Sequence, residues 1–191
     1  MMPPATRGSV AAALAAGYTR IGIIDGAIDD GVCVPLHELE GALAVPNVEL
    51  IGGASVGAIS AVQLRSAGMR GIGRVFRLFC RGSLSDAEEV HVLHAPAALR
   101  YRCLTLPLVN IRYTLRAITQ SGQLDPAEER AIVDYMCAVP WFDRDRQALC
   151  AAVYAASGSS ASQRLMQTFE STYRDVKHED AMAVISALLR R

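Results

Sequence analysis

The chain has 191 residues, of which 51% are hydrophobic and 20% charged, as in a globular protein long enough to bury a sizeable core. Positive and negative side chains balance at 19 each, so the overall charge gives no indication of nucleic-acid binding. No apolar stretch reaches the roughly 18 residues that a membrane-spanning helix needs, and the alanine-rich N-terminus lacks the pattern of a signal peptide.

The first half of the chain alternates between helix and strand patterns. The predicted elements are helices at residues 9–16 and 34–44 and strands at residues 18–24 and 48–51. Such alternation is typical of α/β proteins in which helices flank a small parallel sheet. Ligands bind at the carboxyl ends of parallel strands, so residues 25–26 and 53–57 are expected at one functional edge.

The second half is mainly helical. A glycine-rich connection at residues 68–73 leads into a helix at 74–81, and the alternating sequence at residues 90–94 predicts a third strand. Further helices are predicted at residues 108–120, 126–138, 143–156, 162–173 and 176–189. We expect a single domain, with an α/β part over about residues 1–105 and a helical part over about residues 106–191.

The sequence G-A-S-V-G at residues 53–57 lies between a predicted strand and a helix-forming run. In that setting a G-x-S-x-G turn presents a serine hydroxyl at the strand end, and N–H groups at the helix start can bind an oxyanion. We therefore predict that Ser55 is a nucleophile and that the turn binds the oxyanion and substrate through Gly53, Val56 and Gly57. A purely structural turn is the alternative, because the pattern also occurs by chance.

A serine nucleophile needs a base, because its hydroxyl is hardly ionised at neutral pH. His37 lies in the first turn of the helix predicted at residues 34–44, where the helix dipole disfavours imidazolium and leaves a neutral ring able to accept a proton. An ordinary surface histidine is the alternative. Asp25 follows a predicted buried strand and is expected either to orient a base or a substrate amide, or to cap the turn.

Three more polar residues are candidate ligand-binding groups. His94 ends the third predicted strand; it lies three residues after His91, so the two rings face opposite sides and a shared metal is not expected. Asn110 and Arg112 interrupt an apolar run, either to bind a ligand or as the polar face of a helix. The five cysteines are widely spaced and form no C-x-x-C pair, which fits reduced thiols in a cytoplasmic protein. We expect neither a metal nor a cofactor.

Several segments, taken in order, resemble the TfuA-like core domain family. They are I-I-D-G at 23–26, H-E at 37–38, G-A-S-V-G-A at 53–58, G-M-R-G-I-G at 68–73, E-E-V at 88–90, L-H-A-P at 93–96, L-V-N-I-R at 108–112, and Lys177 with D-A at 180–181. Each motif alone is weak, but their order and spacing are specific. The resemblance covers about residues 3–190.

The resemblance implies a role beside a YcaO-type enzyme in making peptide thioamides. In that role the protein hydrolyses the C-terminal thiocarboxylate of a ThiS-like sulfur carrier with a Ser–Lys pair, and it helps YcaO engage its substrate peptide. Ser55 matches the serine. His37 stands where the family has one lysine, and Lys177, the only lysine of this chain, matches another. The leading hypothesis is a Ser55–His37 pair, with Lys177 as the alternative base.

Two other functions stay open. One is a non-catalytic adaptor that binds YcaO and the peptide. The other is a serine esterase or patatin-like hydrolase, although the sequence contains neither the Asp-Gly-Gly nor the Gly-Gly-Gly motif of that family. The expected partners are a YcaO-type enzyme, a thiocarboxylated carrier protein and a substrate peptide, with neither nucleic acid nor a membrane.

Overall fold

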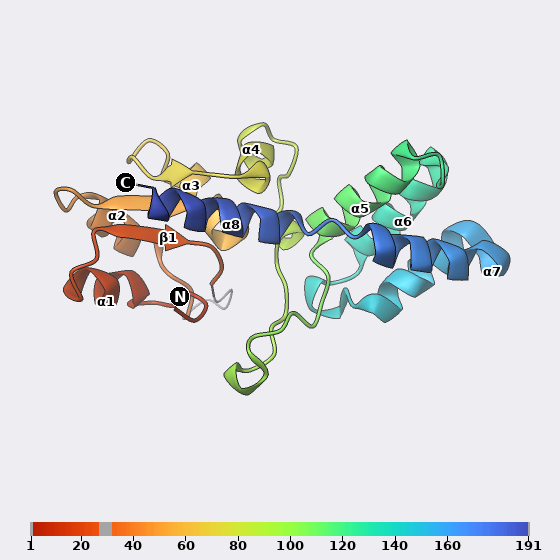
Figure 1. Ribbon diagram of the computed structural model, residues 1–191, viewed down its shortest axis with the longest axis horizontal. Coiled ribbons are helices and arrows are strands. Elements are labelled where there is room, and N and C mark those ends of the chain that lie inside the picture. The colour runs from red at the N-terminus through yellow and green to blue at the C-terminus, as the bar shows by residue number, and fades with distance from the viewer. Residues whose placement is uncertain (1, 27–31, 191) are drawn as a thin grey trace. The chain divides into compact units, whose positions relative to one another are not determined.

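The computed structural model describes residues 2–26 and 32–190. The chain forms two compact units, one from Met1–Ala87 with Val176–Arg191 and the other from Glu88–Asp175. We call them the sheet unit and the helical unit, and Figure 1 shows their elements. Within the described ranges, no helix is long and apolar enough to cross a membrane.

The sheet unit contains three parallel strands in the order β1-β2-β3. These are β1 (Arg20–Ile23), β2 (Glu49–Gly52) and β3 (Arg70–Gly71). The residues at the ends of the strands are in register, with Ile23 opposite Gly52 and Gly52 opposite Gly71. A small parallel sheet with flanking helices confirms the α/β prediction.

The third strand does not form where the sequence predicted it. Residues 90–94 belong to the helical unit and make only an isolated antiparallel bridge, between His94 and Cys103. Their alternation instead reflects burial, because Val90 and Val92 are buried while Leu93 is exposed. β3 lies in the glycine-rich connection, where two residues are too few to show a strand period.

One face of the sheet is covered by α1 (Ser9–Ala15), α2 (Leu36–Leu43) and α3 (Val56–Gln63). Their apolar side chains form a core with the inward-facing residues of β1 and β2. This cluster comprises Val10, Ile23, Leu39, Ala42, Leu50, Ala61, Leu64 and Met69. The neighbouring helix α4 (Arg74–Cys80) follows β3 and contacts α3.

The other face is covered by α8 (Val176–Leu189), which lies along β1 in the opposite direction (Figure 1). Its Val184 side chain packs into the space above Gly22 and Gly53, where those residues have no Cβ. The guanidinium of Arg20, at the start of β1, donates to the carbonyls of Ala187, Leu188 and Arg190. These contacts fix the last turn of α8 at the amino end of β1 and so place its first turn near the carboxyl ends of the strands.

The helical unit is built from α5 (Leu108–Gln120), α6 (Pro126–Ala138) and α7 (Arg146–Thr172). Short 3₁₀ turns lie at Ala87–Glu89, Ala97–Leu99 and Trp141–Asp143. Asp125 and Glu128 form a capping box that starts α6. The helices predicted at residues 143–156 and 162–173 form a single element, α7, which is interrupted where Gly158 adopts φ 72°.

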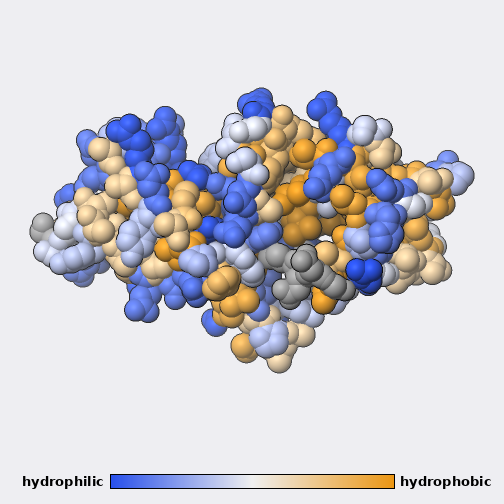
Figure 2. Space-filling view, turned by 180° about the vertical axis from the view of Figure 1, so that it is seen from behind, coloured by the Kyte–Doolittle hydropathy of each residue, from blue (hydrophilic) through white to orange (hydrophobic). Residues whose placement is uncertain are grey.

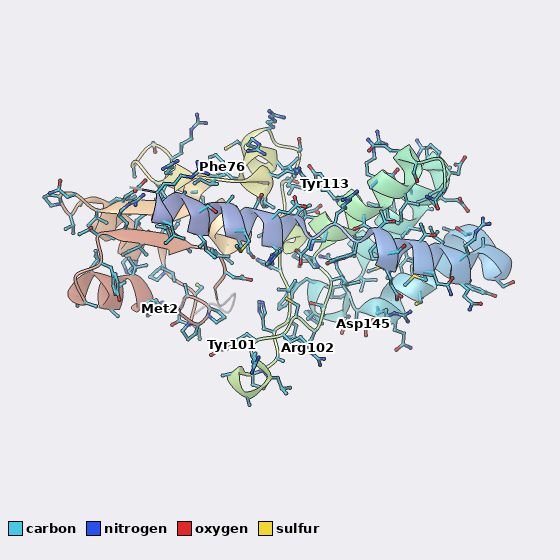
Figure 3. All side chains as sticks on the ribbon, viewed as in Figure 1. Met2, Phe76, Tyr101, Arg102, Tyr113 and Asp145 are labelled. Atoms are coloured by element: carbon cyan, nitrogen blue, oxygen red, sulfur yellow. The ribbon has the colours of Figure 1, made fainter. Side chains whose placement is uncertain are left out.

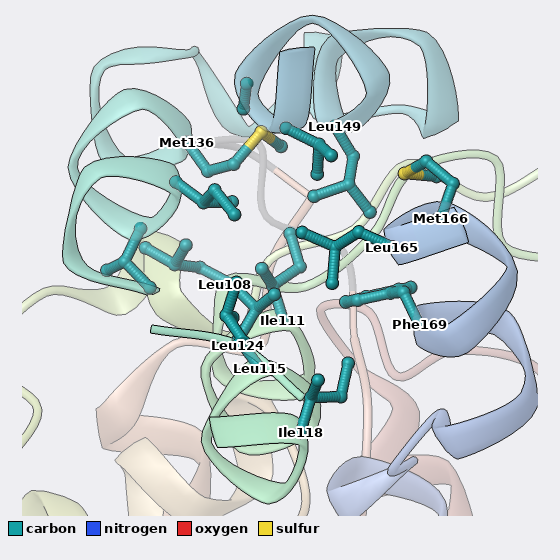
Figure 4. Packing of buried hydrophobic residues seen from close by; sticks show 14 residues of the cluster. Leu108, Ile111, Leu115, Ile118, Leu124, Met136, Leu149, Leu165, Met166 and Phe169 are labelled. Carbon is teal, nitrogen blue, oxygen red and sulfur yellow. The ribbon is translucent and has the colours of Figure 1, made fainter. Parts of the chain in front are cut away.

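Large aliphatic side chains fill the core of the helical unit. Figure 4 shows this cluster, whose members include Leu108, Ile111, Leu115, Ile118, Leu124, Met136, Leu149, Leu165, Met166 and Phe169. A loop of this unit carries exposed apolar side chains at Leu99 and Leu104, and orange atoms mark it at the bottom of Figure 2.

Candidate active site

Ser55 lies in the tight turn between β2 and α3. The preceding residue, Ala54, has φ 67°, in the left-handed region that costs a residue with a Cβ about 1–2 kcal/mol. The turn is closed by a 2.8 Å hydrogen bond from the Ser55 N–H to the Gly53 carbonyl. Gly57 brings α3 against β1, because a Cβ there would lie 1.8 Å from the Ile23 carbonyl oxygen. Backbone strain and close packing therefore both concentrate beside Ser55.

The Ser55 hydroxyl does not have the usual structural role of a serine at a helix start. Ser55 occupies the N-cap position of α3, but its side chain makes no capping hydrogen bond. The residue is 1% exposed, so a substrate carbonyl reaches Oγ only after the covering atoms move. Helix capping therefore does not explain why a buried serine occupies this strained turn.

The N–H groups at the start of α3 are partly used within the fold. Gly57 donates to the Ile24 carbonyl over 3.4 Å, and Ala58 donates to the Ser55 carbonyl over 2.8 Å. No acceptor for the Val56 N–H lies within residues 2–26 and 32–190. Val56 is therefore the donor best placed to bind an oxyanion, whereas Gly57 must first give up its contact with Ile24.

Lys177 and Asp25 form a shielded ion pair at this edge of the sheet. Lys177 Nζ lies 3.7 Å from Asp25 Oδ2, and the two side chains are 11% and 23% exposed. Asp25 follows β1 and Ser55 follows β2, and adjacent parallel strands end at the same edge. Because α8 runs antiparallel to β1, its first turn places Lys177 at that edge. The pair thus joins a residue after the first strand to one in the last helix.

His37 has different surroundings. It is exposed in the first turn of α2, and among the described residues it makes no hydrogen bond or ion pair. The next side chain, Glu38, accepts hydrogen bonds from the N–H groups of Gly8, Val10 and Ala11 at the start of α1. His37 therefore lies on an exposed helix surface, whereas Lys177 is paired with Asp25 at the carboxyl edge of the sheet.

The remaining predicted ligand-binding residues lie in the helical unit. Asn110 is buried and donates to the Tyr173 hydroxyl and the Asp175 carboxylate, each over 2.9 Å. Arg112 donates from both Nε and Nη2 to the carboxylate of Glu89. The Asn110 and Arg112 side chains therefore have partners inside their own unit. The backbone of His94 forms the isolated bridge to Cys103.

Asp180 is a site-forming residue that the sequence alone does not identify as one. Its two carboxylate oxygens accept the N–H groups of Arg74 and Val75, each over 2.7 Å, at the start of α4. Gly73 makes this possible with φ 102°, since a Cβ there would lie 2.2 Å from the carboxyl carbon. Burial raises the pKa of Asp180, and the two backbone donors oppose that shift. Asp180 thereby anchors α8 one turn after Lys177.

Comparison with known proteins adds a family to this geometry. A family model described as TfuA-like protein matches residues 25–145, more than half of the 191-residue chain. The matched segment contains Asp25, His37 and Ser55. No curated protein matches the sequence.

Proposed function

Because the chain belongs to the TfuA-like protein family, we propose that it serves YcaO-dependent peptide thioamidation by releasing sulfide from a thiocarboxylated, ThiS-like sulfur carrier. Family membership supports the association with thioamidation. The hydrolytic step is inferred from one observation: a buried serine whose hydroxyl does not cap its helix lies on the same sheet edge as a shielded Lys177–Asp25 pair.

In the proposed reaction, the Lys177 ammonium first passes a proton to the Asp25 carboxylate, which leaves a neutral amine. Ser55 Oγ then attacks the thiocarboxyl carbon at the carrier's C-terminus while its proton passes to that amine, which in turn gives the proton to the departing sulfur. The C–S bond breaks, hydrosulfide leaves, and the carrier remains as an ester on Ser55. Water then attacks the ester carbon, the C–O bond to Ser55 breaks, and the serine regains its proton. The overall step is hydrolysis to hydrosulfide and a carboxylate, which YcaO follows by adding the sulfur to an activated peptide amide.

The surrounding residues have separate parts in this proposal. Asp25 holds the Lys177 amine at the sheet edge through their ion pair. The Val56 N–H binds the developing oxyanion, a contribution of about 3–4 kcal/mol where single donors of this kind have been removed. Gly53 and Gly57 let α8 and β1 pack closely against the turn, which holds the turn in place.

A single-turnover assay of sulfide release from a thiocarboxylated carrier tests the proposal. We expect Ser55→Ala to lower the rate roughly 1,000-fold or more, because no other hydroxyl takes its place. Ser60→Ala is the matched control, since Ser60 is also buried in α3 but lies one turn deeper in the helix. Unchanged sulfide release by Ser55→Ala would refute the hydrolytic step.

The same assay identifies the base. We expect Lys177→Met to abolish the burst of sulfide and His37→Ala to retain it, because only Lys177 is shielded and paired at the Ser55 edge. The opposite pattern would assign the base to His37.

The burial of Ser55 favours a second candidate, a non-catalytic adaptor for YcaO and its peptide. In a reconstituted thioamidation reaction whose only sulfur source is the thiocarboxylated carrier, an adaptor retains full activity as Ser55→Ala. A serine esterase is distinguished more simply, since it would turn over small p-nitrophenyl esters rapidly. We expect only slow turnover here because Ser55 is covered.

A further inference from the structure

A second candidate binding site lies in the sheet unit, away from Ser55. It is a hollow of about 880 Å³ between α4 and α8, within the size range of ligand sites. Four arginines line it: Arg20, Arg70, Arg77 and Arg190. Phe76, labelled in Figure 3, also lines it and extends its ring over Gly71 of β3.

The charge of this arginine hollow is only partly neutralised. Glu49 pairs with Arg20 over 2.8 Å and with Arg70 over 3.1 Å. The side chains of Arg77 and Arg190 are exposed, and within the described ranges neither makes a hydrogen bond or an ion pair. Asp180 interacts electrostatically with Arg77 but already accepts two backbone N–H groups, so the two exposed guanidinium groups can still attract anions from a partner.

The backbone around the hollow does not form a phosphate cradle. Phosphate sites use free N–H groups at a helix start, but the carboxylate of Asp180 already takes those of Arg74 and Val75. The last turn of α8, whose carbonyls repel a concentrated negative charge, lies at the Arg20 end. Separate carboxylates, each reaching one arginine, fit this arrangement better than a phosphate.

The apolar parts of the lining indicate what joins those carboxylates. Ile72, Phe76 and Ala187 lie between the arginines and offer surface to aliphatic side chains. The described part of the sheet ends at β3, which pairs with β2 on one side only, so an extended chain can lie along its open edge. A peptide that alternates acidic and apolar residues matches both features.

We propose that the arginine hollow binds an extended acidic segment of a partner protein. The carboxylates pair with Arg77 and Arg190, and the apolar side chains contact Phe76 and the small residues of α8. None of the residues that line the hollow has a role in the proposed reaction at Ser55. This binding site can therefore be tested independently of the hydrolysis proposed above.

Fluorescence anisotropy with a labelled peptide of alternating Glu and Leu tests this inference on the intact protein. We expect binding that weakens as salt rises, and no binding of the matched peptide with Gln in place of Glu. The double variant Arg77→Glu/Arg190→Glu should bind at least tenfold more weakly. Arg65→Glu, an exposed arginine elsewhere in the sheet unit, is the control and should bind like the parent.

Three outcomes would overturn the proposal: no binding of the Glu peptide, equal binding of the Gln peptide, or loss of binding by the Arg65 control alone. Tripolyphosphate serves as a competitor. If it displaces the peptide while the double variant still binds the peptide normally, the arginines of the hollow are not the peptide site. Circular dichroism of each variant checks folding, and Arg77→Gln replaces the double variant should that one fail to fold.

Discussion

The starts of α3 and α4 occupy equivalent positions in the fold, but they differ in which groups accept hydrogen bonds from their first N–H groups. Each helix follows a parallel strand at the same edge of the sheet, after a turn that contains glycine. At α4, Asp180 reaches across from α8 and takes two N–H groups. At α3, the N-cap residue is Ser55, and its hydroxyl does not cap. One helix start is thus capped by a carboxylate from a distant helix, whereas the N-cap side chain of the other does not cap it.

The largest expected effect comes from removing the close packing at the start of α3. Gly57→Val places side-chain atoms against the Ile23 carbonyl and pushes α3 away from β1. We expect a loss of about 3 kcal/mol or more in the free energy of unfolding, measured by urea denaturation. Gly41→Val, at a position in α2 with open space around it, is the control and should not destabilise the protein, because valine has a higher helix propensity than glycine.

Breaking the α4 cap should cost less. Asp180→Ala leaves the N–H groups of Arg74 and Val75 without their acceptor, and we expect a loss of about 2–3 kcal/mol in unfolding free energy. Thermal unfolding of the variant beside Asp180→Asn, which keeps one oxygen acceptor, separates the cap from packing. A cap is the wrong explanation if the Asn variant is as unstable as the Ala variant.

Ser55→Ala should affect stability only slightly and activity strongly. Because the hydroxyl does not cap α3, we expect a change in unfolding free energy below about 1 kcal/mol, while sulfide release is lost. Melting temperature and single-turnover rate measured on the same preparation give both values. A stability loss as large as that of Asp180→Ala would make the two helix starts equivalent and remove the distinction.

The smallest effect concerns the opposite end of the strands. The hydrogen bond from Arg20 lowers the pKa of Glu49, and partial burial opposes that shift. A lowered pKa in the folded state stabilises the fold above the unfolded-state pKa, and this contribution disappears as the pH falls through the folded-state value. Glu49→Gln should therefore be less stable than the parent at neutral pH, by no more than about 1 kcal/mol for this partly exposed pair, and equally stable well below pH 4.

Local sequence signals predicted much of this fold. The bounds predicted for α5 and α6 agree with the structure because Pro107, Asp125 and Pro126 mark their first turns. The turn that carries Ser55 was also predicted locally, since its motif, strand and helix are contiguous. β3 was missed because two residues between glycines carry no periodic pattern.

Contacts between residues that lie far apart in the chain could not be predicted from the sequence. The pairing of Asp25 with Lys177, and that of Asp180 with the start of α4, both depend on α8 returning to the sheet. A helical pattern gives the length of α8 but not the surface on which it packs. The hydrogen bonds from the start of α1 to Glu38 likewise join segments that are separated in the sequence.

Because the chain contains a single lysine, chemical modification of that residue can be used to follow the exposure of the sheet edge. Apart from the α-amino group, the Lys177 amine is the only primary amine in the chain, and its side chain is 11% exposed. An acylating reagent should modify it slowly while the sheet edge is covered and faster when that edge opens. The mass of the peptide that contains residue 177, followed over time with each partner present, would therefore report which of them uncovers the site, without any engineered label.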